Sequence, residues 1–143
     1  MTRQEFLNMI KTNGATVYTP PTQRDIALCN ANLQRMRIAM LPPFMSDLFS
    51  VAGAINLGNG YIYGVTETLR TGTTPIPSIG QINADLSGIA ALHGKTVFGR
   101  NDLFWFSFNA FGKCEMLDNT TARPLREYSD PMRALTDCLI AGK

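Results

Sequence analysis

The sequence predicts a single α+β domain over residues 1–143, in which a mainly antiparallel sheet of about five to six strands is flanked by helices. Helical patterns fill the chain up to about residue 53, strand patterns separated by turns follow up to residue 117 with one helical insert, and a last helical pattern closes it. A chain of 143 residues buries about 68% of its unfolded surface. That is enough for one core, whereas two independent domains would each lie near the lower size limit.

Three helices are predicted before the sheet. Thr2 and Glu5 form a capping box, Thr22 and Asp25 form a weaker one, and Leu41-Pro42-Pro43 opens a short third helix. Asn13-Gly14 ends the first helix, and Gly53 closes the third. Each helix carries apolar residues at helical spacing: Phe6, Met9 and Ile10; Ile26, Cys29, Leu33 and Met36; Phe44, Leu48 and Phe49.

Turn residues then divide the chain into strands. Gly58-Asn59-Gly60 predicts a hairpin between Ala54–Leu57 and Tyr61–Val65. A Thr-, Gly- and Pro-rich loop from Arg70 to Pro77 shows no periodicity. The later strands are expected at Thr96–Arg100, Leu103–Phe108 and Lys113–Leu117, joined by turns at Asn101-Asp102 and Asn109–Gly112.

Two further helices complete the prediction. Ser78 and Gln81 cap a mid-chain helix that carries Ile82, Leu86 and Ile89. Ser129-Asp130-Pro131 opens the last helix, whose inward residues are Met132, Leu135 and Leu139. We expect Phe44, Leu48, Leu135 and Leu139 to pack against the same sheet.

Composition and charge exclude several classes of protein. A net charge of +2, evenly spread, is too small for binding driven by neutralisation of nucleic-acid phosphates. No apolar run approaches the ~20 residues that span a bilayer. The polar, helical start at Met1–Glu5 is unlike a signal peptide. We therefore expect neither nucleic acid nor membrane as a partner.

The three cysteines, Cys29, Cys114 and Cys138, form no CxxC pair and no zinc spacing. A secreted disulfide framework would be expected to use an even number. We interpret them as reduced, mostly buried thiols of a cytoplasmic protein.

Two glycine-containing segments resemble nucleotide motifs but fail their requirements. A phosphate-binding loop needs Gly or Ala five residues before its Gly-Lys-Ser/Thr, but Ile89 occupies that position before Gly94-Lys95-Thr96. Such a loop also follows a strand, whereas a helical stretch precedes this one. Gly94 is more simply a helix stop. Gly58–Gly64 has Tyr63 in place of the third glycine of a dinucleotide fingerprint, so it is interpreted as a turn. No cofactor is expected.

Side chains that could do chemistry are scattered. His93 is the only histidine, and no motif gives it metal partners. Asp102, Glu115 and Asp118 lie on or near neighbouring strands, where solvated charges are the simpler interpretation. A small enzyme or small-ligand protein with a pocket near His93 and Asp102 remains the alternative function.

The segment Leu103–Phe108 is aromatic on both faces. We interpret it as a central strand covered by helices on one side. Alternatively, one face of this strand lies in a partner groove, carrying either Phe104, Phe106 and Phe108 or Trp105. A charged fraction of 17% against the usual ~25% weakly favours a binding protein.

From Leu41 onward, the order of several short motifs resembles the SUKH superfamily. These motifs are Leu41-Pro42 with its short helix, Ala52-Gly53-Ala54, Tyr61–Gly64, Val97–Asp102, Phe104–Phe108, Gly112 with Cys114–Asp118, Tyr128–Asp130 and Leu135–Leu139. Two positions depart from the family pattern. Ala52-Gly53 replaces the usual Asn-Gly, and Leu103 follows Asp102 where glycine is usual.

The resemblance implies a single α+β domain that binds other proteins without catalysis. The superfamily includes bacterial toxin-immunity proteins and a yeast cell-wall synthesis regulator, so a toxin domain is the implied partner. We expect partner binding to use large side chains on or beside the turns of the sheet. The candidates are Tyr61, Tyr63, Arg100, Asp102 and Trp105.

Overall fold

The computed structural model describes residues 1–141 and has helices on a seven-stranded sheet. The elements in chain order are α1 (Arg3–Thr12), β1 (Thr16–Val17), α2 (Gln23–Arg35), α3 (Pro43–Phe49), β2 (Ile55–Leu57), β3 (Gly60–Ile62), α4 (Ile79–Asp85), the 3-10 turn η1 (Ala90–Leu92), β4 (Thr96–Arg100), β5 (Phe104–Phe108), β6 (Cys114–Asp118), β7 (Pro124–Tyr128) and α5 (Pro131–Ile140).

The sheet is an antiparallel meander in which every strand pairs with its neighbours in sequence, from β1 to β7. This confirms the predicted α+β class. The sheet has seven strands where about five to six were expected, and β1 and β7 are the two that the sequence did not locate. β1 has only two residues, and four of the five residues of β7 are exposed. Both are edge strands without alternating burial, so hydrophobic periodicity does not reveal them.

The capping motifs place the helices as predicted. Thr2, Thr22 and Ser78 each accept a hydrogen bond from the backbone N–H three residues on, and each pairs reciprocally with the side chain there. The mid-chain helix α4 ends at Asp85, earlier than its apolar pattern suggested, and η1 follows as a separate turn.

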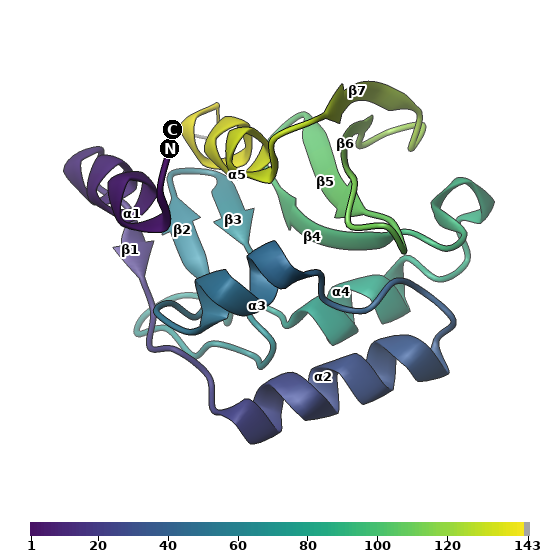
Figure 1. The fold of residues 1–143 in the computed structure, drawn as a ribbon, viewed down its shortest axis with the longest axis horizontal. Coiled ribbons are helices and arrows are strands. Elements are labelled where there is room, and N and C mark those ends of the chain that lie inside the picture. Colours follow the sequence, from purple (N-terminus) through teal and green to yellow (C-terminus); the bar gives the residue numbers. More distant parts are fainter. Residues whose placement is uncertain (142–143) are drawn as a thin grey trace.

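The helices cover the sheet unequally (Figure 1). α3 and α5 lie in front of the strands, α1 lies beside α5, and α4 lies between the sheet and α2. α5 approaches very closely: a Cβ on Gly60 would lie 2.7 Å from the Cys138 carbonyl oxygen, and one on Gly99 would lie 2.9 Å from Cys138 Sγ. These two glycines therefore mark the sheet face that α5 covers.

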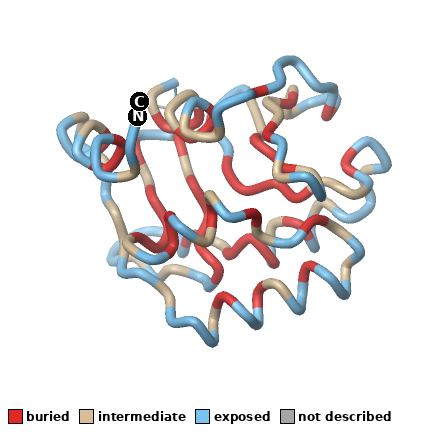
Figure 2. The backbone as a smooth tube through the Cα atoms, viewed as in Figure 1, coloured by how far each residue is buried: buried red, intermediate tan, exposed pale blue. Residues whose placement is uncertain are grey.

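The core runs through the middle of the sheet and the inner sides of the helices (Figure 2). Leu48, Leu135 and Leu139 are buried, as predicted. Phe44 is half-buried and meets the rings of Phe98 and Phe108 edge-on, at centroid distances of 6.0 and 6.3 Å. The expected packing of these helices on one sheet is confirmed.

Candidate functional site

The sheet register brings three of the candidate residues into one row. Tyr61 of β3 pairs directly with Arg100 of β4, and Arg100 pairs with Trp105 of β5. Directly paired residues share a face, and neighbours along a strand alternate. Because Gly60 and Gly99 face α5, this row lies on the opposite face of the sheet.

Tyr63 follows β3 and lies on the same side as Tyr61. Both line a pocket of about 180 Å³ together with Arg100. Tyr63 is only 3% exposed, and its hydroxyl has no hydrogen-bond partner within residues 1–141. Its burial raises the pKa of the phenol well above its ordinary value, and the nearby Arg100 opposes this only in part. The hydroxyl is therefore neutral at physiological pH.

A fourth polar side chain comes from the loop between β3 and α4. Thr68 and Ile76 exchange two backbone hydrogen bonds of 2.9 Å, which close this loop. Inside it, Arg70 Nε donates to the Thr74 carbonyl oxygen at 2.9 Å. Arg70 thereby lines the same pocket. The sequence does not single out Arg70, because the loop has no periodicity and no local motif indicates which part of the sheet the loop covers.

We call the four residues Tyr61, Tyr63, Arg70 and Arg100 the arginine–tyrosine pocket. The guanidinium carbons of Arg70 and Arg100 lie 5.6 and 5.8 Å from the centroid of the Tyr61 ring. These are cation–π distances. Thr74, Pro75, Ile76, Pro77 and Ile82 form the rest of the wall.

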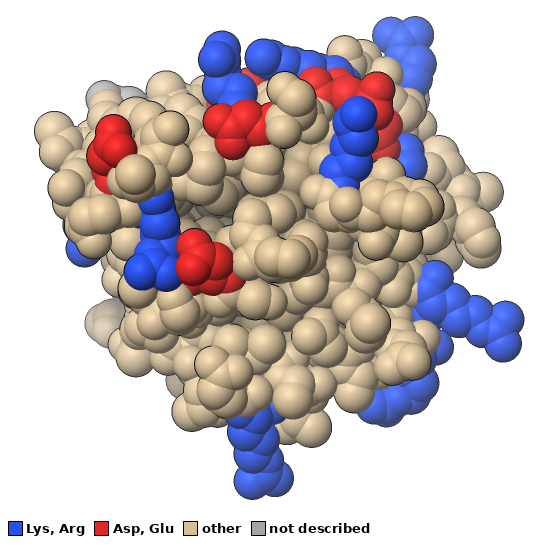
Figure 3. All heavy atoms as spheres, in the orientation of Figure 1, with Lys and Arg blue, Asp and Glu red and all other residues tan. Residues whose placement is uncertain are grey.

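The positive charge in this pocket is not neutralised by any residue that the structure describes. Neither Arg70 nor Arg100 forms an ion pair within the described part of the chain. By contrast, Arg126 and Arg133 both pair with Asp137, at 3.0 and 3.4 Å. Figure 3 shows charges of both signs gathered near α5 and β7, and an uncharged centre of the α3 face. Arg70 and Arg100 differ in this from Arg126 and Arg133; exposed arginines such as Arg24 and Arg35 are also without an ion pair among the described residues, but they line no pocket with a second arginine.

The other two predicted site residues lie outside this pocket. Asp102 is exposed in the turn between β4 and β5, where its carboxylate accepts a hydrogen bond of 3.0 Å from Asn59 Nδ2. This bond joins two turns at one end of the sheet. Trp105 is half-buried and packs against the core. The structure thus brings together Tyr61, Tyr63 and Arg100, with Trp105 beside them in the row.

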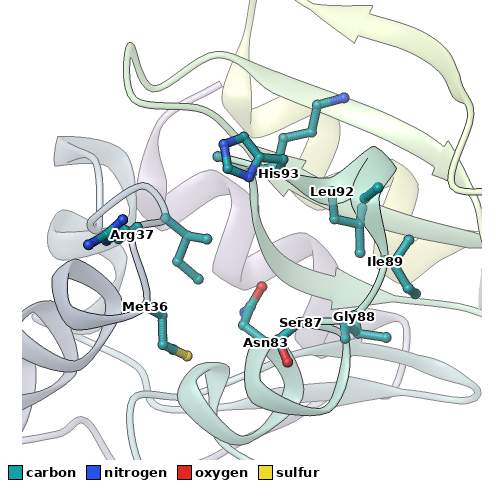
Figure 4. Close-up of a pocket in the computed structure, with 13 residues that line it drawn as sticks. Met36, Arg37, Asn83, Ser87, Gly88, Ile89, Leu92 and His93 are labelled. Atoms are coloured by element: carbon teal, nitrogen blue, oxygen red, sulfur yellow. The ribbon is translucent and has the colours of Figure 1, made fainter.

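His93 lines a different pocket of about 410 Å³, between the end of α2 and the segment from α4 to β4. Figure 4 shows Met36 and Arg37 on one side and Ser87, Gly88, Ile89 and Leu92 on the other. No Asp or Glu is among its lining residues, so His93 has no carboxylate there to orient it. Asp102 follows the far end of β4 and is not among the residues that line the pocket of His93.

The rejected phosphate loop also has a structural role. Gly94 has φ +76° between η1 and β4, a conformation that favours glycine. Lys95 Nζ pairs with the Glu115 carboxylate at 3.0 Å, and both side chains are mostly buried. A 3-10 turn precedes this segment and a strand follows, which is the reverse of the order that phosphate binding needs.

Residues 1–141 contain no group of three or more His, Cys, Asp or Glu side chains that could hold a metal ion. Cys29, Cys114 and Cys138 are buried, unpaired thiols, as predicted. No helix among the described residues is long and apolar enough to cross a bilayer.

Comparisons with protein-family models, with curated proteins and with solved structures find no match to this chain.

Proposed function

We propose that this protein is a non-catalytic binding module that holds a protein partner at the arginine–tyrosine pocket. The observation that carries the proposal is that two guanidiniums converge on one tyrosine ring without an acidic residue to neutralise them. Arginine and tyrosine are the residue types most often found at the energetic centre of protein interfaces. The SUKH-like order of motifs supports the same function, with a toxin domain as the partner.

The four residues of the pocket differ in how far they are exposed, in a way that suits a protein interface. Arg100 is exposed, Tyr61 and Arg70 are half-buried, and Tyr63 is almost fully buried. A partner that covers Arg100 would meet side chains already held by packing and by the Arg70–Thr74 hydrogen bond. Prior ordering of this kind reduces the entropy lost on association.

The proposal places the protein in the cytoplasm. Three unpaired, buried thiols support this compartment, because cytoplasmic thiols are kept reduced. A cytoplasmic binding protein could intercept a toxin domain where that domain acts.

The test is affinity capture from lysate of the native host, with the partner identified by mass spectrometry and then purified. Three baits are compared: wild type, Arg70→Gln/Arg100→Gln, and the control Arg24→Gln/Arg35→Gln. The control removes the same charge from the exposed side of α2. The proposal expects one partner that wild type and control retain and that the pocket variant loses.

Calorimetry with the purified partner then measures the affinity. Each single arginine change should weaken binding by about 2 kcal/mol or more if the residue is an interface anchor. His93→Ala should leave the affinity unchanged. A partner bound equally by all three baits, or no partner retained by wild type, would contradict the proposed site. Loss of partner inactivation in His93→Ala with unchanged affinity would contradict a non-catalytic function.

A further inference from the structure

The arginine–tyrosine pocket concentrates positive charge in a small space. Both guanidiniums lie within 6 Å of the same ring centroid. Both arginines also line the same pocket, so their like charges repel within it. An anion seated in the pocket would offset this repulsion and gain charge-assisted hydrogen bonds.

Three groups around the pocket are available to donate hydrogen bonds. Arg70 uses Nε for Thr74, which orients the guanidinium and leaves its terminal nitrogens without a hydrogen bond within residues 1–141. Arg100 makes no side-chain hydrogen bond within the same residues. The Tyr63 hydroxyl is also unpaired there and stays protonated. The site therefore presents donors and, from these three side chains, no charged acceptor.

Size and wall chemistry restrict the ligand further. A volume of about 180 Å³ is below the ~300–1,000 Å³ of typical small-molecule sites, so the pocket can enclose one short side chain but not a whole nucleotide. Ile76, Pro77 and Ile82 form an apolar part of the wall. This wall can pack against methylene groups, whereas inorganic phosphate has no apolar part to place there. The shape and chemistry match a carboxylate on a short aliphatic stem.

We propose that the pocket binds the carboxylate of one acidic side chain, a glutamate supplied by the protein partner. The two guanidiniums hold its oxygens, the Tyr63 hydroxyl donates to one of them, and the methylene stem packs against Ile76 and Ile82. This inference rests on the proposed function, because the glutamate belongs to the partner of that interface.

The test is an NMR titration that needs no partner protein. The probe is the peptide acetyl-Ala-Glu-Ala-amide, and the matched control is acetyl-Ala-Gln-Ala-amide. The Glu peptide should produce saturable shifts of the Arg70 and Arg100 Nε–Hε signals and of the Ile76 amide, with millimolar affinity that falls as salt is raised. The Gln peptide should leave these signals unmoved at the same concentrations.

Variants assign the effect to individual groups. Arg70→Gln and Arg100→Gln should each weaken Glu-peptide binding by about tenfold, as expected for loss of a hydrogen bond to a charged group. Arg70→Lys and Arg100→Lys keep the positive charge but lose the planar guanidinium that can donate two parallel hydrogen bonds. These two variants should weaken Glu-peptide binding less than the Gln variants do. Tyr63→Phe should weaken it while leaving the salt dependence intact. Arg24→Gln/Arg35→Gln should have no effect. Unchanged amide spectra away from the pocket establish that each variant is folded.

Several outcomes overturn the inference. Equal shifts with the Gln peptide, or no shift with either peptide, would exclude a carboxylate site. Tighter binding of inorganic phosphate than of the Glu peptide would assign the pocket to a phosphate ligand instead.

The proposed function fails separately from this inference. If the Glu peptide binds the pocket but the Arg70→Gln/Arg100→Gln bait still captures the partner, the interface proposal is wrong and the carboxylate site stands. If partner capture needs both arginines but the Glu peptide does not bind, the interface stands and its ligand is not a glutamate.

Discussion

At the scale of single residues, Asn83 continues the sheet where a strand has ended. β3 stops at Ile62, and the Asn83 amide of α4 then pairs with the backbone of Val97. Its Nδ2 donates to the Val97 carbonyl oxygen and its Oδ1 accepts from the Val97 N–H, both at 2.9 Å. The side chain is buried, so these bonds replace water that cannot reach Val97.

Asn83→Ala should therefore destabilise the protein by about 2–6 kcal/mol, because it leaves a buried N–H and C=O without partners at about 1–3 kcal/mol each. Urea unfolding measures the change in the free energy of unfolding. Asn59→Ala, which removes an exposed hydrogen bond to Asp102, is the control and should cost less than about 1 kcal/mol. Equal losses of unfolding free energy in the two variants would show that the buried Asn83–Val97 hydrogen bonds contribute no more than an exposed one.

The buried thiols make stability depend on alkaline pH. Burial raises the pKa of Cys29 from 9.0 to about 11, and that of Cys114 to about 12. Between about pH 9 and 11 the unfolded chain releases the Cys29 proton while the folded chain keeps it. The unfolded state then binds fewer protons, so the free energy of unfolding falls as pH rises.

Cys29→Ala should make this decline less steep, because one of the linked protons is removed. The measurement is urea unfolding at pH 8, 9 and 10 for wild type and variant. An identical slope in both proteins would mean that Cys29 does not titrate differently in the two states. Below pH 8 the variant should show only the loss of a small packed side chain.

At the scale of elements, the contact of α5 with the sheet depends on missing side chains. A Cβ on Gly60 would lie 2.7 Å from the Cys138 carbonyl oxygen and 3.0 Å from Leu139 Cα. Both are backbone atoms of α5 and cannot rotate away. The helix and the sheet must separate to admit even one methyl group.

Gly60→Ala should accordingly destabilise the protein by more than about 2 kcal/mol, in the range of other overpacking changes. Gly88→Ala is the matched control, because a Cβ there meets nothing within 4 Å. Thermal unfolding should show a lower midpoint for the first variant and no decrease for the second. A midpoint for Gly60→Ala equal to wild type would show that α5 is not held as closely as described.

At the scale of the whole molecule, one continuous core joins the sheet to its helices. The folded surface of 7525 Å² is close to the ~7,300 Å² expected for one compact chain of this mass. The first and last helices also meet, since α1 packs against α5 (Figure 1). A molecule built in this way should unfold as one unit.

This cooperativity can be followed with two probes. Trp105, the only tryptophan, reports on the centre of the sheet, and far-UV circular dichroism reports on all helices. We expect both signals to give the same urea midpoint. Separate midpoints would mean that the helices before the sheet form a unit that melts on its own.

The sequence alone determined the elements whose signals are local. Capping boxes at Thr2, Thr22 and Ser78 predict helix starts, and Gly58-Asn59 predicts the hairpin turn, because both depend on hydrogen bonds or dihedral angles within a few residues. The pairing of neighbouring strands could also be predicted from the sequence. Once the meander is assumed, Tyr61, Arg100 and Trp105 can be expected near one another.

Which side chains share a pocket depends instead on how distant segments pack together. Arg70 reaches Tyr61 because a loop without periodicity closes through Thr68 and Ile76. His93 and Asp102 are kept apart because β4 lies between them. The edge strands β1 and β7 are likewise set by pairing with strands already formed. Such positions depend on register and loop closure between distant segments, and no short stretch of sequence carries that information.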